Sequence, residues 1–503
     1  MYSFLICIVA LFLGYIFYGR FVERVFGIDN TRKTPAITKT DHVDYVPMRS
    51  WKVYMVQFLN IAGTGPIFGA IMGAKFGPSS YIWIVLGSIF AGAVHDFITG
   101  MLSIRQDGAS LPDIVGEHVG NKARTAMLVI SIILLMLVGA VFVYSPAEIL
   151  GELLPLGFGP EDRSKAVMFW VVVVFLYYII ATMLPVDKVI GKIYPIFAFS
   201  LLFMAAGLFV GLLQRWPSIP EFWDGLANRG PSVGLKDQPI FPCLFITIAC
   251  GAISGFHSTQ SPLMARCLKD EKYGRPIFYG AMITEGIVAL IWAAVSSYFF
   301  FDGGMQEVGA PNGSAPMVVN YVSKSWLGVV GGILAILGVV AAPITSGDTA
   351  FRSARVIMAD FFHLSQKKKL NRLYIAIPLF ALATLLLWYN VADEDGFNVI
   401  WRYFGWANQA LACFTLWTAT DYLSRKYGYA KLLDPEKVVA TPKRPYYLLT
   451  MIPACFMTAV CVTYIFVAEI GFNVSNDYIP YIGVATFVLS FVLHYIIRGK
   501  RTW

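Results

Sequence analysis

The stretch GAISGFHSTQSP, from Gly251 to Pro262, lies in the middle of an apolar segment that runs from Ile240 to Ala265. The segment is long enough to cross a bilayer, which takes about 20 residues of helix. Its centre nevertheless carries glycines, hydroxyl groups, a histidine and a glutamine. A helix broken in lipid exposes backbone N–H and C=O groups, so a break is tolerated only beside protein or a cavity. The stretch therefore predicts an interrupted helix that lines an internal site.

A second stretch, NIAGTGPIFGA at residues 60–70, interrupts the apolar segment 53–75 in the same way. Gly65 and Pro66 suit the start of a helix, because proline is favoured in the first turn. We therefore expect a helix that stops and restarts inside the membrane here as well.

Each restarted helix would begin with a partial positive charge of about half a unit. In the stretch 251–262, the residues that could cap this helix are Ser258, Thr259 or Ser261, with Pro262 in its first turn. Two such ends are favourable for a carboxylate. The carbonyls freed on the other side of each break are favourable for a cation or a polar group.

The composition defines the class of protein. Of the 503 residues, 57% are hydrophobic and only 14% are charged, against about 25% charged in soluble domains. We therefore expect an all-α integral membrane protein that contacts membrane lipids, and no nucleic-acid partner in spite of the net charge of +8. Thirteen membrane-spanning helices are predicted, at residues 3–19, 53–75, 81–104, 125–145, 166–184, 193–213, 240–265, 277–300, 326–350, 373–390, 398–420, 447–468 and 479–497.

The distribution of basic residues predicts the orientation, because Lys and Arg are enriched in cytoplasmic loops. With thirteen spans and an external N-terminus, 31 of the 39 Lys and Arg residues fall on the cytoplasmic side, seven fall outside and Arg402 lies in a span. We therefore expect an external N-terminus, a cytoplasmic C-terminus and location in the bacterial cytoplasmic membrane.

The two interrupted spans are the first and the sixth when the count starts at residue 53. Residues 53–213 then hold five spans and residues 240–420 hold five more. Because five is odd, the second set enters the membrane from the opposite face, as in an inverted repeat. Paired interruptions at corresponding positions point to the central site of a transporter. Residues 1–52 would add a helix and a cytoplasmic linker, and residues 447–503 two further helices.

Ionisable side chains inside spans are costly and commonly functional. Asp348 is the leading candidate for the coupling proton or ion, and it could pair with Arg352 four residues later to close an inner gate. Glu285 follows the second break and is a second proton candidate. His257 lies within the break and could bind substrate or titrate near neutral pH.

Other polar residues in spans have structural interpretations as well. His95 and Asp96 could hold helices together or form part of a proton path, and Asn408 and Gln409 are expected to hydrogen-bond between helices. No HExxH, Walker or CxxC pattern occurs, so we expect no enzyme. A membrane enzyme that uses His95 and Asp96, or a channel, remains as an alternative, although neither explains two broken helices.

The sequence also resembles a known family, the carbon starvation protein A family of bacterial membrane transporters. The matching stretches are DHVDYVP at 41–47, NIAGTGPIFGA at 60–70, FAGAVHDF at 90–97, RQDGASL at 105–111, ITIACGAISGFHSTQS at 246–261, YGAMITEG at 279–286, PITSGDTAFRSAR at 343–355 and FGWANQALA at 404–412. Members are described as peptide or pyruvate uptake systems. The family is similar to the amino acid–polyamine–cation transporters, which have the LeuT-type inverted repeat of five helices.

The resemblance implies further roles. In LeuT-type folds the eighth repeat helix supplies hydroxyl groups to a sodium site, and Thr345, Ser346 and the carbonyl groups around Ala62 and Gly63 would form its equivalent. One stretch departs from the family, in which a His-His pair usually precedes the first break. This chain has Gln57-Phe58-Leu59-Asn60 there, so any role of those histidines is absent or moved.

We therefore predict a secondary transporter, a proton- or sodium-coupled symporter that imports pyruvate, short peptides or another small carboxylate by alternating access. No cofactor is expected besides the coupling H⁺ or Na⁺. The residues expected to line the substrate site are Gly63, Thr64, Gly65, Gly255, His257 and Ser258. The residues expected to bind the coupling ion or proton are Ala62, Thr345, Ser346, Asp348 and Glu285.

Overall fold

The structure is a computed structural model of the 503-residue chain. It describes residues 1–159, 162–183, 186–235, 238–309, 313–366, 368–393, 396–428 and 444–500. Within these ranges all regular structure is helical. The chain is therefore all-α in the part that is described, as its sequence predicts.

The helices of the bundle are α1 (Tyr2–Leu13), α2 (Gly19–Phe26), α4 (Ser50–Ile61), α5 (Thr64–Ala74), α6 (Ser79–Leu86), α7 (Ala93–Arg105), α8 (Leu111–Val119), α9 (Asn121–Leu153), α10 (Arg163–Met183), α11 (Val186–Arg215), α12 (Phe245–Thr247), α13 (Gly255–Ala265), α14 (Gly280–Phe301), α16 (Ala315–Phe361), α17 (Lys369–Ala392), α18 (Gly396–Gly428), α19 (Leu448–Val467) and α20 (Ile479–Lys500). The short helices outside them are α3 (Pro35–Thr38) and α15 (Gly304–Val308). The π-helical turns are η1 (Gly14–Tyr18), η2 (Gly87–Gly92), η6 (Ile240–Leu244) and η8 (Arg275–Tyr279), and the 3-10 turns are η4 (Phe222–Asp224), η5 (Gly230–Val233), η7 (Glu271–Tyr273) and η9 (Asn476–Tyr478).

Nine helices in the described ranges are long and apolar enough to cross a membrane, or ten when the bent pair α4 and α5 is counted as one span. The other predicted spans coincide with η6–α12–α13, with part of α16 and with α18. The total of thirteen therefore stays a prediction. The predicted first span, 3–19, is too short, because the helix continues through η1 and α2 to Phe26.

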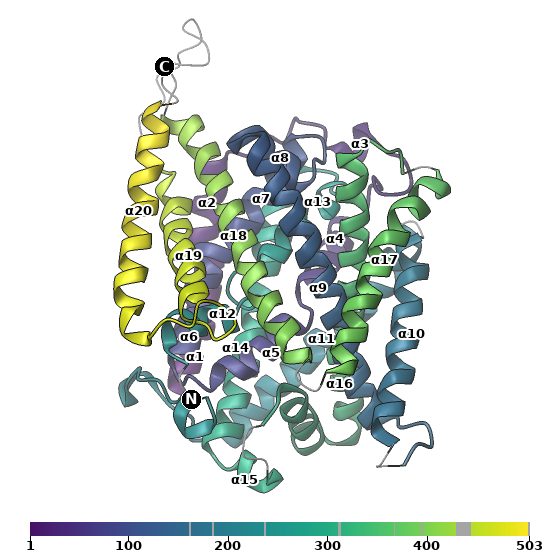
Figure 1. The fold of residues 1–503 in the computed structure, drawn as a ribbon, viewed down its shortest axis with the longest axis vertical. Coiled ribbons are helices and arrows are strands. Elements are labelled where there is room, and N and C mark those ends of the chain that lie inside the picture. Colours follow the sequence, from purple (N-terminus) through teal and green to yellow (C-terminus); the bar gives the residue numbers. More distant parts are fainter. Residues whose placement is uncertain are drawn as a thin grey trace, which may run out of the picture.

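The helices run mostly along the long axis of the molecule (Figure 1). The N-terminus lies at one end of the bundle, and α3 and α8 lie at the other (Figure 1). Helices α17 and α20 lie at the sides and expose apolar side chains such as Trp388 and Val484, as expected where a protein meets lipid. By contrast, α7, α13 and α14 are almost wholly buried, so the interior is built around the second broken helix.

The first predicted interruption is confirmed. Helix α4 ends at Ile61 and α5 begins at Thr64, with a bend of 48° between them. Pro66 falls in the first turn of α5, where its missing N–H costs no helical hydrogen bond. The backbone of Ala62 and Gly63 is therefore released from the helix in the interior of the protein.

The second predicted interruption is also confirmed, but its capping was predicted wrongly. Helix α12 ends at Thr247, and α13 restarts at Gly255, with Ser254 before it. Ser258, Thr259 and Ser261 therefore lie inside α13, and Pro262 lies well past its first turn. The physical reason is that Asn408 of α18 caps this helix: its Oδ1 accepts from the Phe256 amide at 2.7 Å and from the Ser254 hydroxyl at 3.1 Å.

The two breaks touch through glycine. A Cβ atom at Gly65 would lie 2.3 Å from the Cys250 sulfur, and one at Gly69 would lie 2.8 Å from the Thr247 carbonyl oxygen. Real Cβ atoms do not approach so closely. Glycine at these positions therefore lets α5 lie directly against the segment 247–250 that follows α12.

The carbonyl groups released at the breaks are hydrogen-bonded to other elements. Ser346 of α16 donates to Leu59 at 3.0 Å, and Trp83 of α6 donates to Ile248 at 3.1 Å. Ser88 of η2 donates to the Gly251 carbonyl at 3.1 Å. Gln409 donates to Phe245 at 3.1 Å, which confirms the expected interhelical role of Gln409. These donors stabilise a backbone that lipid could not solvate.

Gly255→Ala tests the close approach of α13 to α18. The added Cβ would lie 2.2 Å from the Asn408 carbonyl oxygen and 2.5 Å from the Ala412 nitrogen, both backbone atoms that cannot rotate away. Overpacking of this kind costs typically about 1–3 kcal/mol, so we expect a lower melting temperature of the purified protein in detergent.

The control is Gly159→Ala, whose Cβ would meet no described atom within 4 Å. This control should melt with the wild type, because the added methyl group displaces nothing. Equal melting temperatures for the two variants would contradict the packing described.

Candidate functional site

His257 is held between two carboxyl groups at the start of α13. Its Nδ1 lies 2.9 Å from Oδ2 of Asp96 on α7, and its Nε2 lies 3.3 Å from Oε2 of Glu285 on α14. The second oxygen of Asp96 lies 2.7 Å from Nδ1 of His95. All four side chains are fully buried. Four residues that the sequence marked at three separate places, His95 with Asp96, His257 and Glu285, therefore form one cluster beside the second break.

The geometry limits where protons can be. An imidazole N–H donates to a carboxylate oxygen, so Asp96 is placed to accept from both His257 and His95. The Nε2 of His257 then faces Glu285, but this nitrogen and both Glu285 oxygens make no hydrogen bond among the described residues. One proton, on either partner, would be needed to join them. Without that proton, two acceptors would face each other at 3.3 Å. The contact between α13 and α14 therefore depends on one proton.

Several buried polar atoms around the first break have no hydrogen-bond partner within the described ranges. They are both amide atoms of Asn60, Oγ1 of Thr64 and Oε1 of Gln57. Asn60 precedes the break and Thr64 follows it. A buried polar group left unpaired costs about 1–3 kcal/mol, so a cluster of them indicates a place for a polar ligand or water.

Asn60 and His257 lie at a similar level. Gln57 of α4 donates to Ser261 of α13 at 3.3 Å. Asn60 lies about one turn further along α4, toward the first break, and His257 lies about one turn back along α13, toward the second break. The two breaks are in contact with each other. The unpaired amide of Asn60 and the His257 cluster therefore belong to one polar region. Sequence reasoning mentioned Asn60 only as a departure from the family.

Asp348 lies in a separate buried site on α16. The Tyr194 hydroxyl of α11 lies 2.7 Å from its Oδ2. Arg352 is 4.0 Å from its Oδ1, and the guanidinium donates to the Ala181 carbonyl at 2.7 Å instead. The role of Asp348 and Arg352 as a gate pair therefore stays a prediction.

The residues expected to form a sodium site are divided in their contacts. Ser346 reaches the end of α4, where it donates to Leu59 and lies 3.0 Å from the place a Cβ of Gly63 would take. The Thr345 hydroxyl lies 2.8 Å from the Ala342 carbonyl of its own helix. Ser346 is therefore beside the first break, as the family resemblance implies, and Thr345 bonds within α16.

The residues expected to line the substrate site are all buried. They differ in whether their polar groups are free to bind a ligand. Thr64 has an unpaired hydroxyl. The Ser258 hydroxyl donates to the Gly255 carbonyl at 2.6 Å, and Gly255 packs against the α18 backbone. The substrate role of these two residues therefore stays a prediction without support from their contacts.

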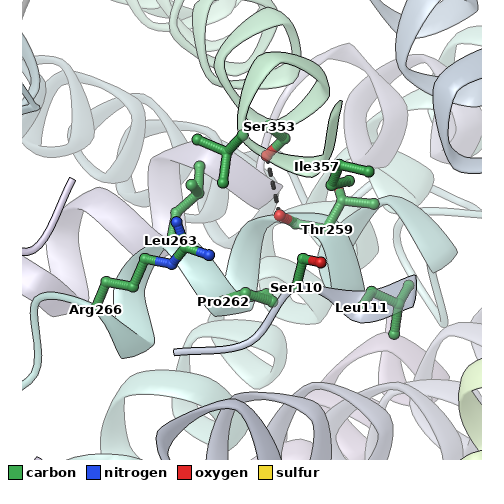
Figure 2. A pocket seen from close by; sticks show the side chains of 9 residues that line it. Ser110, Leu111, Thr259, Pro262, Leu263, Arg266, Ser353 and Ile357 are labelled. Carbon is green, nitrogen blue, oxygen red and sulfur yellow. Dashed lines mark hydrogen bonds between the residues drawn. The ribbon is translucent and has the colours of Figure 1, made fainter. Parts of the chain in front are cut away.

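The end of the molecule that holds α3 and α8 carries an ion pair that sequence reasoning missed. Asp44, on the segment between α3 and α4, lies 3.1 Å from Arg355 of α16, and both are buried. Nearby, a pocket is lined by Ser110, Leu111, Thr259, Pro262, Leu263, Arg266, Ser353, Val356 and Ile357. Figure 2 shows the Ser353 hydroxyl bonded to the Thr259 carbonyl inside it. The sequence signals were the motifs at 41–47 and 343–355, which contain Asp44 and Arg355.

Broken helices around a buried titratable cluster, in an all-helical apolar bundle, define the class of a membrane transporter. The fold is shared with a crystal structure of the Eremococcus coleocola manganese transporter, with a TM-score of 0.57 and 12% identity over 92% of this chain and 99% of that chain. A likeness at this identity concerns the fold alone.

The chain belongs to the carbon starvation protein CstA family, which it matches over residues 1–158, 162–323 and 303–464. It is 42% identical to an uncharacterized membrane protein of Haemophilus influenzae over 64% of this chain and 99% of that protein. It is 28% identical to the peptide transporter CstA of Escherichia coli, over 80% of this chain and 74% of that protein. It is also 28% identical to the pyruvate/proton symporter BtsT of Escherichia coli, over 57% and 47%. Family members with these names are transporters, in accord with the prediction of no enzyme.

Asn408→Ala tests the cap on α13. The change leaves the Phe256 amide unpaired in a buried position, which costs about 1–3 kcal/mol. We expect a lower melting temperature and weaker substrate-dependent stabilisation, measured on the purified protein. Asn371→Ala is the control, because Asn371 makes an exposed bond to the Ser365 carbonyl. A cap variant as stable as the control would contradict the role assigned to Asn408.

Proposed function

We propose that the protein is a proton-coupled symporter that imports a small carboxylate-bearing nutrient, pyruvate or a short peptide, by alternating access. The observation that carries this proposal is the buried His257 cluster, in which Nε2 of His257 on α13 lies 3.3 Å from Glu285 on α14, close enough for the two to share a proton. The relatives support it, because their names include peptide transporters and a pyruvate/proton symporter.

The proposed architecture is an inverted repeat of five plus five helices, with residues 53–213 and 240–420 as the two repeats. Residues 1–52 and 447–503 are additions to this core. The pattern of packing supports it: the second helix of the first repeat, α7, packs on broken helix α13, and the second helix of the other repeat, α14, packs on broken helix α5. Asp96 and Glu285 thus come from corresponding helices and meet at one imidazole.

In the proposed cycle, the proton between His257 and Glu285 holds α13 and α14 together. Its release toward the cytoplasm leaves a lone pair and a carboxylate facing each other, and this repulsion favours separation of the two helices. Such a change alters the broken helices that line the substrate site. The proton is thereby coupled to the opening of the site, as a symporter requires.

The substrate would lie at the first break, near the unpaired polar atoms of Asn60 and Thr64. Gly63 and Gly65 stay candidate substrate residues, although they pack against Phe142 and Cys250, and the N-terminus of α5 favours a carboxylate. Asp348 remains the second candidate for the coupling proton, and Ala62, Thr345 and Ser346 remain the candidate sodium ligands. The protein would lie in the cytoplasmic membrane with its N-terminus outside and the α3 and α8 end inside.

Uptake into proteoliposomes tests the function directly. Radiolabelled pyruvate and alanyl-alanine are offered under an imposed proton gradient, a sodium gradient or neither. We expect accumulation of at least one of them with the proton gradient alone. Accumulation with the sodium gradient alone would instead assign coupling to the candidate sodium ligands around Ser346. Flux that ignores both gradients, or no flux of either compound, would contradict the proposal.

Glu285→Gln tests the coupling step. The amide keeps a permanent donor to His257, so the bond between α13 and α14 can no longer lose its proton. We expect gradient-driven accumulation to fall to the level of protein-free liposomes, while exchange of labelled for unlabelled substrate continues. Glu117→Gln, at an exposed position, is the control and should accumulate substrate normally. Normal accumulation in Glu285→Gln would remove the assigned role.

Asp348→Asn separates the two coupling candidates. The asparagine keeps an acceptor for the Tyr194 hydroxyl, so the local hydrogen bond can persist. If the His257 pair carries the proton, this variant still accumulates substrate under a proton gradient. Loss of accumulation with retained exchange would assign coupling to Asp348 instead.

A further inference from the structure

The segment between α3 and α4 lies against the end of the second broken helix, at the α3 and α8 end of the molecule (Figure 1). It is pinned by the Met48 amide, which donates to the Cys267 carbonyl at 3.1 Å, and by the Tyr45 hydroxyl, which donates to the Asp107 carbonyl at 3.1 Å. Asp41 shapes it by accepting from three successive backbone amides, at residues 43–45. We call residues 40–49 the plug. Its Asp44 carboxyl points into the protein and is buried.

The plug carboxylate is surrounded by guanidinium groups. Arg355 contacts it at 3.1 Å, and Arg352 and Arg266 also act on it electrostatically. Burial, the largest influence, raises the pKa of the Asp44 carboxyl, but these three cations together hold the pKa below its ordinary value. Asp44 is therefore an ionised carboxylate at neutral pH, held by arginines in a buried place.

The arginines around Asp44 have other partners that remain if the plug leaves. Arg266 donates to Asp360 and to the Gly108 carbonyl, both at 2.8 Å, and lies 5.0 Å from the Tyr45 ring. Arg355 is bonded to Gln366, and its Nε has no hydrogen-bond partner among the described residues. Removal of Asp44 would therefore leave Arg355 without an anion in a buried site, which is costly unless another anion replaces it.

A polar track leads from the His257 cluster to this site. Gln260, about one turn below His257 on α13, donates to Ser353 at 3.2 Å, and Ser353 donates to the Thr259 carbonyl at 2.9 Å. Ser353 and Thr259 line the pocket in Figure 2, and Arg266 lines the same pocket. The pocket thus contains Arg266, one of the arginines that act on Asp44, together with Thr259 and Ser353.

We propose that Arg355 and Arg266 form a binding site for the substrate carboxylate on the cytoplasmic side. In the structure described, Asp44 occupies this site, which the substrate carboxylate takes on its way to the cytoplasm. The inference rests on the proposed function. A site of this kind offers the departing anion a cation as soon as the plug leaves, and return of Asp44 displaces that anion. The plug is then a competitor for the exit site and does more than close the path.

Alkylation of Cys267 tests binding at this site without any transport. Its sulfur is buried 4.0 Å from the Asp44 carbonyl, and burial raises the pKa of the Cys267 thiol to about 12. A membrane-impermeant thiol reagent is applied to the α3 and α8 side of reconstituted protein, and modification of Cys267 is followed by mass spectrometry. Cys267→Ser identifies the labelled position.

We expect slow labelling in the wild type and labelling at least severalfold faster in Asp44→Asn, because the plug is released. In Asp44→Asn, pyruvate or alanyl-alanine should slow the labelling, whereas pyruvamide and alanyl-alanine amide, which lack the carboxylate, should not. Labelling that stays slow in Asp44→Asn, or that the carboxylates do not slow, or that the amides slow equally, would overturn the inference. Absence of wild-type uptake would instead count against the proposed function. The labelling result does not depend on uptake, because it measures binding alone.

A charge exchange separates a substrate site from a simple latch. In the double variant Asp44→Arg with Arg355→Asp, the buried pair is restored with its charges reversed, so Cys267 should again label slowly. Uptake should remain lost, because an aspartate now faces the departing carboxylate. The matched control exchanges Glu23 and Arg275, an ion pair at 2.9 Å between α2 and η8, and should keep uptake. Recovery of uptake in the Asp44 and Arg355 exchange would show that this ion pair only holds the plug in place and does not bind the substrate.

Discussion

The backbone of two broken helices has to be hydrogen-bonded inside a protein that lies in lipid, and the rest of the structure depends on this constraint. Ser346, Trp83, Ser88 and Gln409 donate to the released carbonyl groups, and Asn408 accepts from the restarted helix α13. These partners come from four other elements of the bundle, α6, η2, α16 and α18. The breaks are therefore held open by tertiary contacts, and a change in those contacts changes the site that they line.

Two buried charge systems lie along the second broken helix and have different tasks in the proposed cycle. The His257 cluster ties α13 to α7 and α14 through a contact that needs one proton. The plug, at the end of the same helix, places the Asp44 carboxylate on Arg355. Burying such charges costs several kcal/mol per ion unless they are paired. Loss of one partner therefore leaves a buried charge unpaired, which strongly disfavours the closed arrangement. A transport cycle can use this to change from one arrangement to another.

Sequence reasoning was accurate where the cause is local. Gly65-Pro66 and the glycines around residue 255 predict breaks because their backbone preferences act over a few residues. The start of α13 was misplaced because its cap, Asn408, lies in another helix. His257, Glu285 and Asp96 were each named as candidates, but their meeting depends on how α7, α13 and α14 pack. Asp44 was missed because a loop carboxylate is usually solvated, and only the fold places it among arginines.

The proposed cycle depends most on a proton that Glu285 carries toward His257 and releases during transport. Infrared difference spectroscopy of the reconstituted protein, with and without substrate at fixed pH, detects the protonation of a buried carboxyl group. The account predicts a change in the protonated-carboxyl band on addition of substrate, and its absence in Glu285→Gln. A spectrum without such a change, or the same change in Glu285→Gln, would contradict it.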